Sequence, residues 1–211
     1  MSHPAASPDF WHTRWNANQI GFHEGTTNAA LQRWCPTLGL APDSRVFVPL
    51  CGKSADLAWL AAQGHEVVGV ELSALAVQAF FTENGLTPER QEVGALIRWS
   101  AGRVTIYQGD VFAFDAPGTF DAAWDRAALI ALPPDVRIRY ATHVRRQLRA
   151  DAPMLVVTLV YDQARRDGPP FSVPDAELRA HHPEAVLLGR EPAEARWDDI
   201  GGAENVVWRI R

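Results

Sequence analysis

The segment Gly52-Lys53-Ser54 is the first stretch of the chain whose residue types could bind a ligand. Gly-Lys-Ser ends the phosphate-binding loop of nucleotide hydrolases, where successive backbone amides wrap around the phosphates. That loop also needs a glycine at position 47, where this chain has Phe47. The three-glycine fingerprint of dinucleotide-binding proteins is missing too, because only Gly52 is present. A phosphate-binding loop is therefore disfavoured, and a nucleotide hydrolase stays as an alternative.

An acidic residue, Glu71, follows 19 residues after Gly52, at the end of an apolar run. An acid at about this offset commonly accepts hydrogen bonds from ribose hydroxyls, because the two strand ends are neighbours in a βαβ unit. Without a glycine-rich cradle for pyrophosphate, an adenosine ligand that lacks phosphates, such as S-adenosylmethionine, fits better than a dinucleotide. The alternative for Glu71 is a solvated carboxylate at a strand end.

Two further apolar runs end in polar residues. Asp110 and Val111 follow the first run and could flank an adenine ring, the acid toward the amine and the apolar side chain against the face. The alternative is a turn aspartate after Gly109. The second run ends in Asp125 and Arg126, which lie at the same expected crevice or only pair with each other at the surface.

Apolar strands that alternate with amphipathic helices position these residues. A mostly parallel sheet covered on both faces follows from this alternation, and in such sheets ligands bind outside the carboxyl ends of the strands. A last strand at 206–210 is expected to pair antiparallel with a weaker one at 186–188. The other expected strands cover 46–50, 67–72, 104–107, 120–124 and 154–161, and the expected helices 54–63, 73–83 and about 135–149.

The composition narrows the classes of protein and partner. The 211 residues carry a net charge of −5, so nucleic acid is not an expected partner. No apolar run approaches the ~18 residues of a membrane span, and no export signal marks the first thirty residues, so a cytoplasmic protein is expected. Of the 20 basic residues only Lys53 is a lysine. Codon bias explains the arginines, whereas Lys53 could pair with a ligand carboxylate or with Asp56.

Six short blocks follow one another along the sequence. They are FWHxRW at 10–15, IGFH at 20–23, VPLCGKS at 48–54, GHxVxGVELS at 64–73, WDRxAL at 124–129 and GPPFxV at 168–173. In this order and with similar gaps, the blocks resemble the bacterial branch of the thiopurine S-methyltransferase family. The similarity runs from about residue 9 to the C-terminus and is weakest beyond about 185.

This resemblance implies a class I methyltransferase, or Rossmann-like, α/β fold. The expected sheet has seven strands, mostly parallel with an antiparallel last strand, and helices on both faces. Residues 1–8 are expected to be a flexible N-terminus. Residues 9–211 are expected to form a single methyltransferase domain, whose N-terminal helical cap covers about 9–40 and begins with Asp9 as the N-cap.

By position, the resemblance also assigns residues to S-adenosylmethionine and to the methyl acceptor. Phe22 corresponds to a residue on the acceptor side. No catalytic base is predicted, because an aromatic thiol is substantially ionised near neutral pH. His23 is a packing residue or assists departure of a proton. No metal site is predicted, because the two cysteines have no His or Cys partner at metal-ligand spacing, and no protein partner is identified. Arg165 or Arg166 could orient the acceptor. The predicted cofactor contacts are Trp11, Leu50, Glu71, Asp110, Val111 and Arg126.

The expected activity is an in-line methyl transfer from S-adenosylmethionine to a thiopurine or another aromatic thiol. Two alternatives concern the same fold. The first is methylation of selenium or tellurium oxyanions, of selenols or of other small thiols, as in metalloid detoxification. The second is a module that binds S-adenosylmethionine and catalyses nothing.

Overall fold

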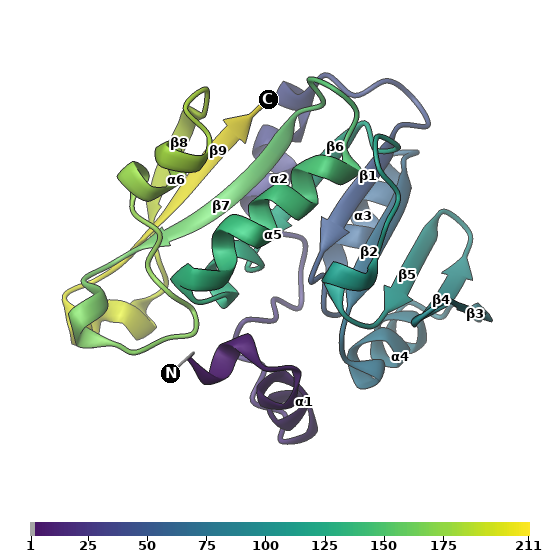
Figure 1. Cartoon of the computed structure of the whole chain (residues 1–211), viewed down its shortest axis with the longest axis horizontal. Coiled ribbons are helices and arrows are strands. Elements are labelled where there is room, and N and C mark those ends of the chain that lie inside the picture. The colour runs from purple at the N-terminus through teal and green to yellow at the C-terminus, as the bar shows by residue number, and fades with distance from the viewer. Residues whose placement is uncertain (1–2) are drawn as a thin grey trace.

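Runs of β-branched and other apolar residues form the central strands of one nine-stranded sheet (Figure 1) in the computed structural model, which describes residues 3–211. Five strands run parallel in the order β5-β2-β1-β6-β7. Strand order reverses at β1, which is where ligands bind in open sheets of this kind. The five strands are β1 (Arg45–Pro49), β2 (Glu66–Glu71), β5 (Val104–Gln108), β6 (Ala122–Arg126) and β7 (Met154–Val160).

The two ends of the sheet are antiparallel. On one side β9 (Glu204–Ile210) pairs with β7, and β8 (Val186–Pro192) pairs with β9, as the sequence predicts. On the other side a hairpin of β3 (Glu89–Val93) and β4 (Leu96–Ala101) adds to β5. The prediction of seven strands is wrong, because it lacks the two strands of this hairpin. All five residues of β3 are exposed, so the strand has no apolar pattern that marks it in the sequence.

Helices cover both faces of the sheet, with one hydrophobic core under each layer. Leu57, Phe80 and Leu31 belong to the core on one face, under α2 (Ala29–Trp34), α3 (Ala55–Ala62) and α4 (Ala74–Glu83). Tyr140 and Leu178 belong to the core on the other face, under α5 (Pro134–Gln147) and α6 (Asp175–His181). The predicted doubly covered α/β fold is therefore confirmed.

The N-terminal helix α1 (Pro8–Asn16) lies at the opposite end of the molecule from the C-terminus (Figure 1). The prediction that Asp9 is its N-cap is wrong. Ser7 is the cap, because its Oγ accepts a hydrogen bond from the Asp9 backbone N–H and Pro8 occupies the first helical position, where no N–H is needed.

The segment before this helix contains a short 3-10 helix at Pro4–Ala6, whose Ala5 is buried. Residues 1 and 2 of the expected flexible N-terminus lie outside the described residues, and its flexibility stays a prediction. Other 3-10 helices lie at Cys35–Leu38, Val111–Ala113, Leu129–Ala131, Gln163–Arg165 and Ala195–Ile200.

Candidate functional site

The turn between β1 and α3 lies at the carboxyl end of the sheet and is tight. Leu50 and Gly52 both have a positive φ, of 47° and 54°, so the chain reverses within a few residues. The Cys51 N–H donates to the Val70 carbonyl at 3.0 Å and ties the turn to β2. Ser54 then caps α3 by accepting from the Asp56 N–H. The turn is closed by sheet and helix contacts and leaves no room for a wide phosphate loop.

Glu71 joins this turn to the one that follows β2. One carboxylate oxygen accepts from the Gly52 N–H at 2.8 Å and the other from the Ser73 N–H at 2.7 Å. Burial raises the pKa of Glu71 to about 7, against the opposing effect of these hydrogen bonds. With a relative exposure of 6%, Glu71 is a buried carboxylate and not the solvated group of the alternative interpretation.

Asp110 and Val111 follow β5 along the same edge of the sheet. Asp110 caps the 3-10 helix Val111–Ala113, and its Oδ1 accepts from the Phe112 N–H at 2.9 Å. Asp110 is exposed and Val111 is buried. The Arg139 guanidinium lies 3.8 Å from the centre of the Phe112 ring, so an aromatic and a cationic side chain adjoin this turn.

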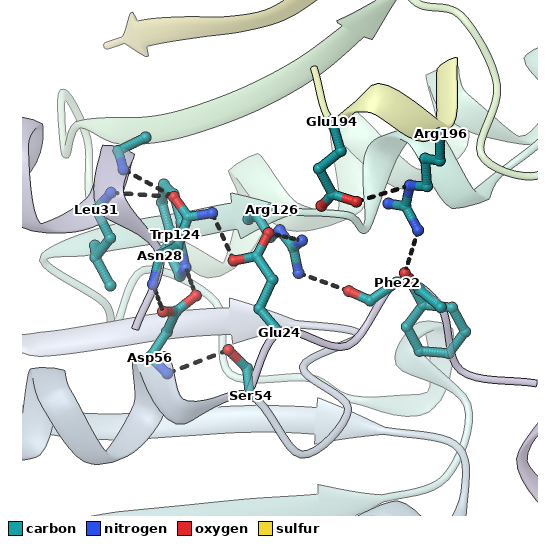
Figure 2. A network of polar contacts seen from close by, with 12 residues as sticks. Phe22, Glu24, Asn28, Leu31, Ser54, Asp56, Trp124, Arg126, Glu194 and Arg196 are labelled. Carbon is teal, nitrogen blue, oxygen red and sulfur yellow. Dashed lines mark hydrogen bonds and ion pairs between the residues drawn. The ribbon is translucent and has the colours of Figure 1, made fainter. Parts of the chain in front are cut away.

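Asp125 and Arg126 separate at the end of β6, so the interpretation that they pair with each other is wrong. Asp125 is buried and accepts from the Tyr140 hydroxyl at 2.7 Å and from the Leu129 N–H at 3.1 Å. Burial raises its pKa to about 6. Arg126 instead donates to the Phe22 carbonyl at 2.8 Å and pairs with Glu24 (Figure 2).

Aromatic side chains from α1 and the following loop cover the turn after β1. Trp11 and Trp15 each pack edge-on against Phe22, with ring centres 6.0 and 5.6 Å apart. A ring carbon of Trp15 lies 3.4 Å from the position of a Cβ on Gly52, so the indole rests on the turn itself. Trp11 also donates its Nε1–H to the Ala5 carbonyl at 3.0 Å.

These elements enclose a cavity of about 830 Å³ between α1 and the carboxyl ends of the strands. All seven predicted site residues line it, which brings positions 11 and 126 to one cavity although they lie far apart in the chain. They are Trp11, Phe22, Leu50, Glu71, Asp110, Val111 and Arg126. A pocket of this size holds a ligand as large as a nucleoside derivative. Its buried acceptor at Glu71 and the glycine turn suit an adenosine group.

Glu24, Arg196 and Trp197 also line the cavity near Phe22 and Arg126, and they are not singled out from the sequence. Glu24 pairs with Arg126, and Arg196 donates to the Gly21 carbonyl beside Phe22, as Figure 2 shows. Trp197 is buried behind Arg196. The only sequence signal for the last two is an Arg-Trp pair in the part of the chain that matches the family least.

Other residues with a suggested role lie elsewhere or have other partners. Lys53 lines the cavity but pairs with Glu83 at 2.6 Å, so its suggested pairing with Asp56 is wrong. Asp56 accepts from the Asn28 N–H and the Trp124 indole instead. Arg165 and Arg166 do not line the cavity; they pair with Asp162 and Asp199. Within residues 3–211 no group of His, Cys, Asp and Glu could hold a metal ion.

The sheet order, the acid at the end of β2 and the cavity above it define a class I methyltransferase fold. The chain shares this fold with a 1,6-didemethyltoxoflavin-N1-methyltransferase of Burkholderia thailandensis solved with S-adenosylhomocysteine. Their TM-score is 0.64 with 19% identity, covering 96% of this chain and 86% of that one. A TehB-like methyltransferase of Corynebacterium glutamicum gives 0.57 with 14% identity, covering 99% and 100%.

The chain belongs to the thiopurine S-methyltransferase family, whose model matches residues 6–189. A thiopurine S-methyltransferase of Pseudomonas entomophila is 56% identical over 175 residues, or 82% of this chain and 81% of that protein. One of Bordetella petrii is 50% identical over 187 residues, or 86% and 85%. The predicted family, fold class and S-adenosylmethionine-dependent S-methyltransferase activity are thereby confirmed, and a nucleotide hydrolase is not favoured.

Proposed function

We propose that the cavity binds S-adenosylmethionine and that its acceptor side takes a thiopurine or a related aromatic thiol. The observation that carries this proposal is the Glu71 carboxylate, which is buried in the cavity wall and bonded to the turns on both sides. Each of its oxygens has one further lone pair, and two neighbouring ribose hydroxyls would use both. The cofactor supplies a methyl group activated by its sulfonium charge.

In this proposal each predicted residue has one task. Glu71 accepts from the ribose, Asp110 and Val111 flank the adenine, and Leu50 lines the wall beneath the cofactor. The Trp11 face attracts the sulfonium by roughly 0.5–2 kcal/mol. Arg126 contacts the cofactor at the end of β6, on the side from which Phe22 approaches.

The acceptor side is aromatic and carries guanidinium groups, which favours a planar acceptor with anionic character. Phe22 and Trp197 supply rings, and Arg126 and Arg196 supply guanidinium N–H donors. Enclosure matters because water stabilises a separated thiolate and sulfonium more than it stabilises the transition state. The main task of the chain is alignment, which can lower a barrier by roughly 7–11 kcal/mol. Selenols are alternative acceptors of the same charge.

We also propose a cytoplasmic location and a small-molecule partner for the protein. Within residues 3–211 no helix is long and apolar enough to cross a membrane. Cys35 and Cys51 are free and buried, which suits a reducing compartment such as the cytoplasm. A small-molecule acceptor is the partner that membership of the family supports.

Titration calorimetry with S-adenosylmethionine tests the cofactor site. We expect one site per chain and a loss of affinity of at least about tenfold in Glu71→Gln, because an amide cannot accept from the hydroxyls as strongly as a carboxylate does. Glu66→Gln is the matched control, since Glu66 lies on the same strand at its far, exposed end. No binding by the wild-type protein, or an equal loss in both variants, would refute the proposed site.

A panel of acceptors with labelled cofactor tests the acceptor class. We expect turnover of aromatic thiols and selenols, with a Phe22→Ala variant raising KM for the acceptor more than for the cofactor. Turnover confined to oxygen or nitrogen acceptors would overturn the thiol assignment. Tight cofactor binding with no turnover of any acceptor would identify a binding module instead.

A further inference from the structure

Glu24 is a cavity residue whose carboxylate is fixed on both sides. One oxygen pairs with the Arg126 guanidinium, and the other accepts from the Asn28 side-chain amide at 2.9 Å (Figure 2). Arg126 and Glu24 side chains are 17% and 33% exposed, so water screens this pair only in part. The carboxylate therefore has a defined place beside Arg126.

Asn28 is itself anchored to the rigid part of the fold. Its backbone N–H donates to Asp56 Oδ1 at 2.8 Å, and Asp56 Oδ2 accepts from the Trp124 indole at 2.8 Å (Figure 2). Asp56 lies in the first turn of α3, directly after the turn at Gly52, and Trp124 precedes Arg126 by two residues on β6. The series of hydrogen bonds that starts at Glu24 therefore ends on α3 and β6, and both elements form the cofactor side of the cavity.

The negative charge of Glu24 matters because Arg126 is one of several arginines that line the cavity. Arg14 and Arg139 also line the cavity, and neither forms an ion pair within residues 3–211. Without Glu24 the cavity would hold a third guanidinium that has no ion-pair partner within residues 3–211. S-adenosylmethionine adds a positive sulfonium to this space, whereas the product, S-adenosylhomocysteine, has a neutral thioether in its place.

We propose that Glu24 is a positioning residue for Arg126 whose negative charge lets the cavity prefer the cationic cofactor over its neutral product. This inference rests on the proposed cofactor site. Glu24 cancels the charge of Arg126 at the point where the sulfonium would otherwise be repelled. The same carboxylate, through Arg126, holds the loop that carries Phe22 in its place.

Calorimetry with both ligands tests the proposal, since the two differ only in the methyl group and its charge. In Glu24→Gln we expect the affinity for S-adenosylmethionine to fall about five- to tenfold more than the affinity for S-adenosylhomocysteine. A merely structural role would weaken both ligands equally, because their ribose, adenine, carboxylate and ammonium groups are the same. An unchanged ratio of the two affinities would overturn the proposal.

Three further variants separate charge from structure. Glu194→Gln removes another carboxylate that lines the cavity and pairs with an arginine, but at 60% exposure, so the ratio should stay within about twofold of wild type. Asn28→Ala removes a partner of Glu24 without changing its charge and should also preserve the ratio. In Glu24→Gln/Arg126→Met both charges are absent, and the ratio should return to within about twofold of wild type.

The outcomes distinguish this inference from the proposed function. A wild-type protein that binds neither ligand would contradict the cofactor site itself. A wild-type protein that binds both, with a shifted ratio in Glu194→Gln as large as that in Glu24→Gln, would contradict only the assignment to Glu24. Circular dichroism on each variant establishes that the compared proteins are folded.

Discussion

Glu71 is a carboxylate whose burial is unfavourable and is offset by hydrogen bonds from backbone amides, among them those of Gly52 and Ser73. Burial without a cation raises its pKa to about 7, from an ordinary value of 4.5. A group held this way is ready to accept further hydrogen bonds. Ligand hydroxyls would improve the solvation that the side chain lost on folding.

The raised pKa of Glu71 predicts a pH-dependent stability for the ligand-free protein. Between about pH 4.5 and 7 the folded chain keeps the proton that the unfolded chain releases. The contribution of Glu71 to stability is therefore present at pH 4.5 and is lost as the pH rises through about 7. Glu71→Gln has no proton to lose, so it should gain stability relative to wild type between pH 5 and pH 8.

Urea unfolding of both proteins at pH 5 and pH 8 measures this difference directly. The comparison cancels the contribution of histidines whose pKa is lowered by burial, such as His65 and His182, because both proteins contain them. A stability difference that is the same at the two pH values would show that Glu71 titrates in its ordinary range.

At the residue scale the sequence predicts those site residues that end a buried strand. Glu71 and Arg126 are the last residues of their strands, and Asp110 follows the end of β5 by two residues, so their place along the chain already brings them to one edge of the sheet. Glu24 stands in a loop and Arg196 in a short 3-10 helix instead. Their approach to Arg126 and Phe22 depends on how the loops fold back, which no local pattern records.

At the scale of elements, the turn after β1 is held by close packing against β2. A Cβ on Gly69 would lie 2.6 Å from Cys51 Sγ and 3.1 Å from a methyl group of Leu57. Cys51 belongs to the turn after β1 and Leu57 to α3, so this glycine lets strand, turn and helix approach one another closely. A side chain at position 69 would collide with Cys51 and Leu57, which explains why a glycine stands there.

Gly69→Ala should therefore destabilise the protein by about 1–3 kcal/mol, because the added methyl group must displace Cys51 and the turn. The same displacement should weaken binding of S-adenosylmethionine. Chemical unfolding and calorimetry measure the two effects. Gly25→Ala serves as the control, since nothing lies within 4 Å of its Cβ position, and its stability should stay within about 0.5 kcal/mol. Wild-type values for Gly69→Ala would mean that the turn tolerates the shift.

The elements differ in how readily their sequence predicts them. The helices α3 and α4 have serine caps, apolar faces and a glycine after their last residues, and both are found as predicted. The hairpin of β3 and β4 is exposed along β3 and has no such pattern. The hairpin joins the sheet because β4 pairs with the edge of β5, and this pairing depends on the tertiary structure.

At the scale of the whole molecule, the cavity lies between segments from both ends of the chain. Residues of α1 form one wall, and the 3-10 helix Ala195–Ile200 contributes Arg196 and Trp197. None of the nine residues of α1 is buried. Phe22, in the loop that follows α1, packs against Trp15. Hydrogen bonds from Arg126 and Arg196 link the same loop to the rest of the fold (Figure 2).

The sequence by itself determined the alternation of strands and helices, the absence of a phosphate loop and the residues at the strand ends. These follow from periodicity, glycine placement and side-chain chemistry, which are local. Only the tertiary structure decided that Lys53 pairs with Glu83, that Asp125 is buried with Tyr140, and that Glu24 meets Arg126. Partners of charged side chains depend on distances between segments remote in the chain, and the fold sets these distances.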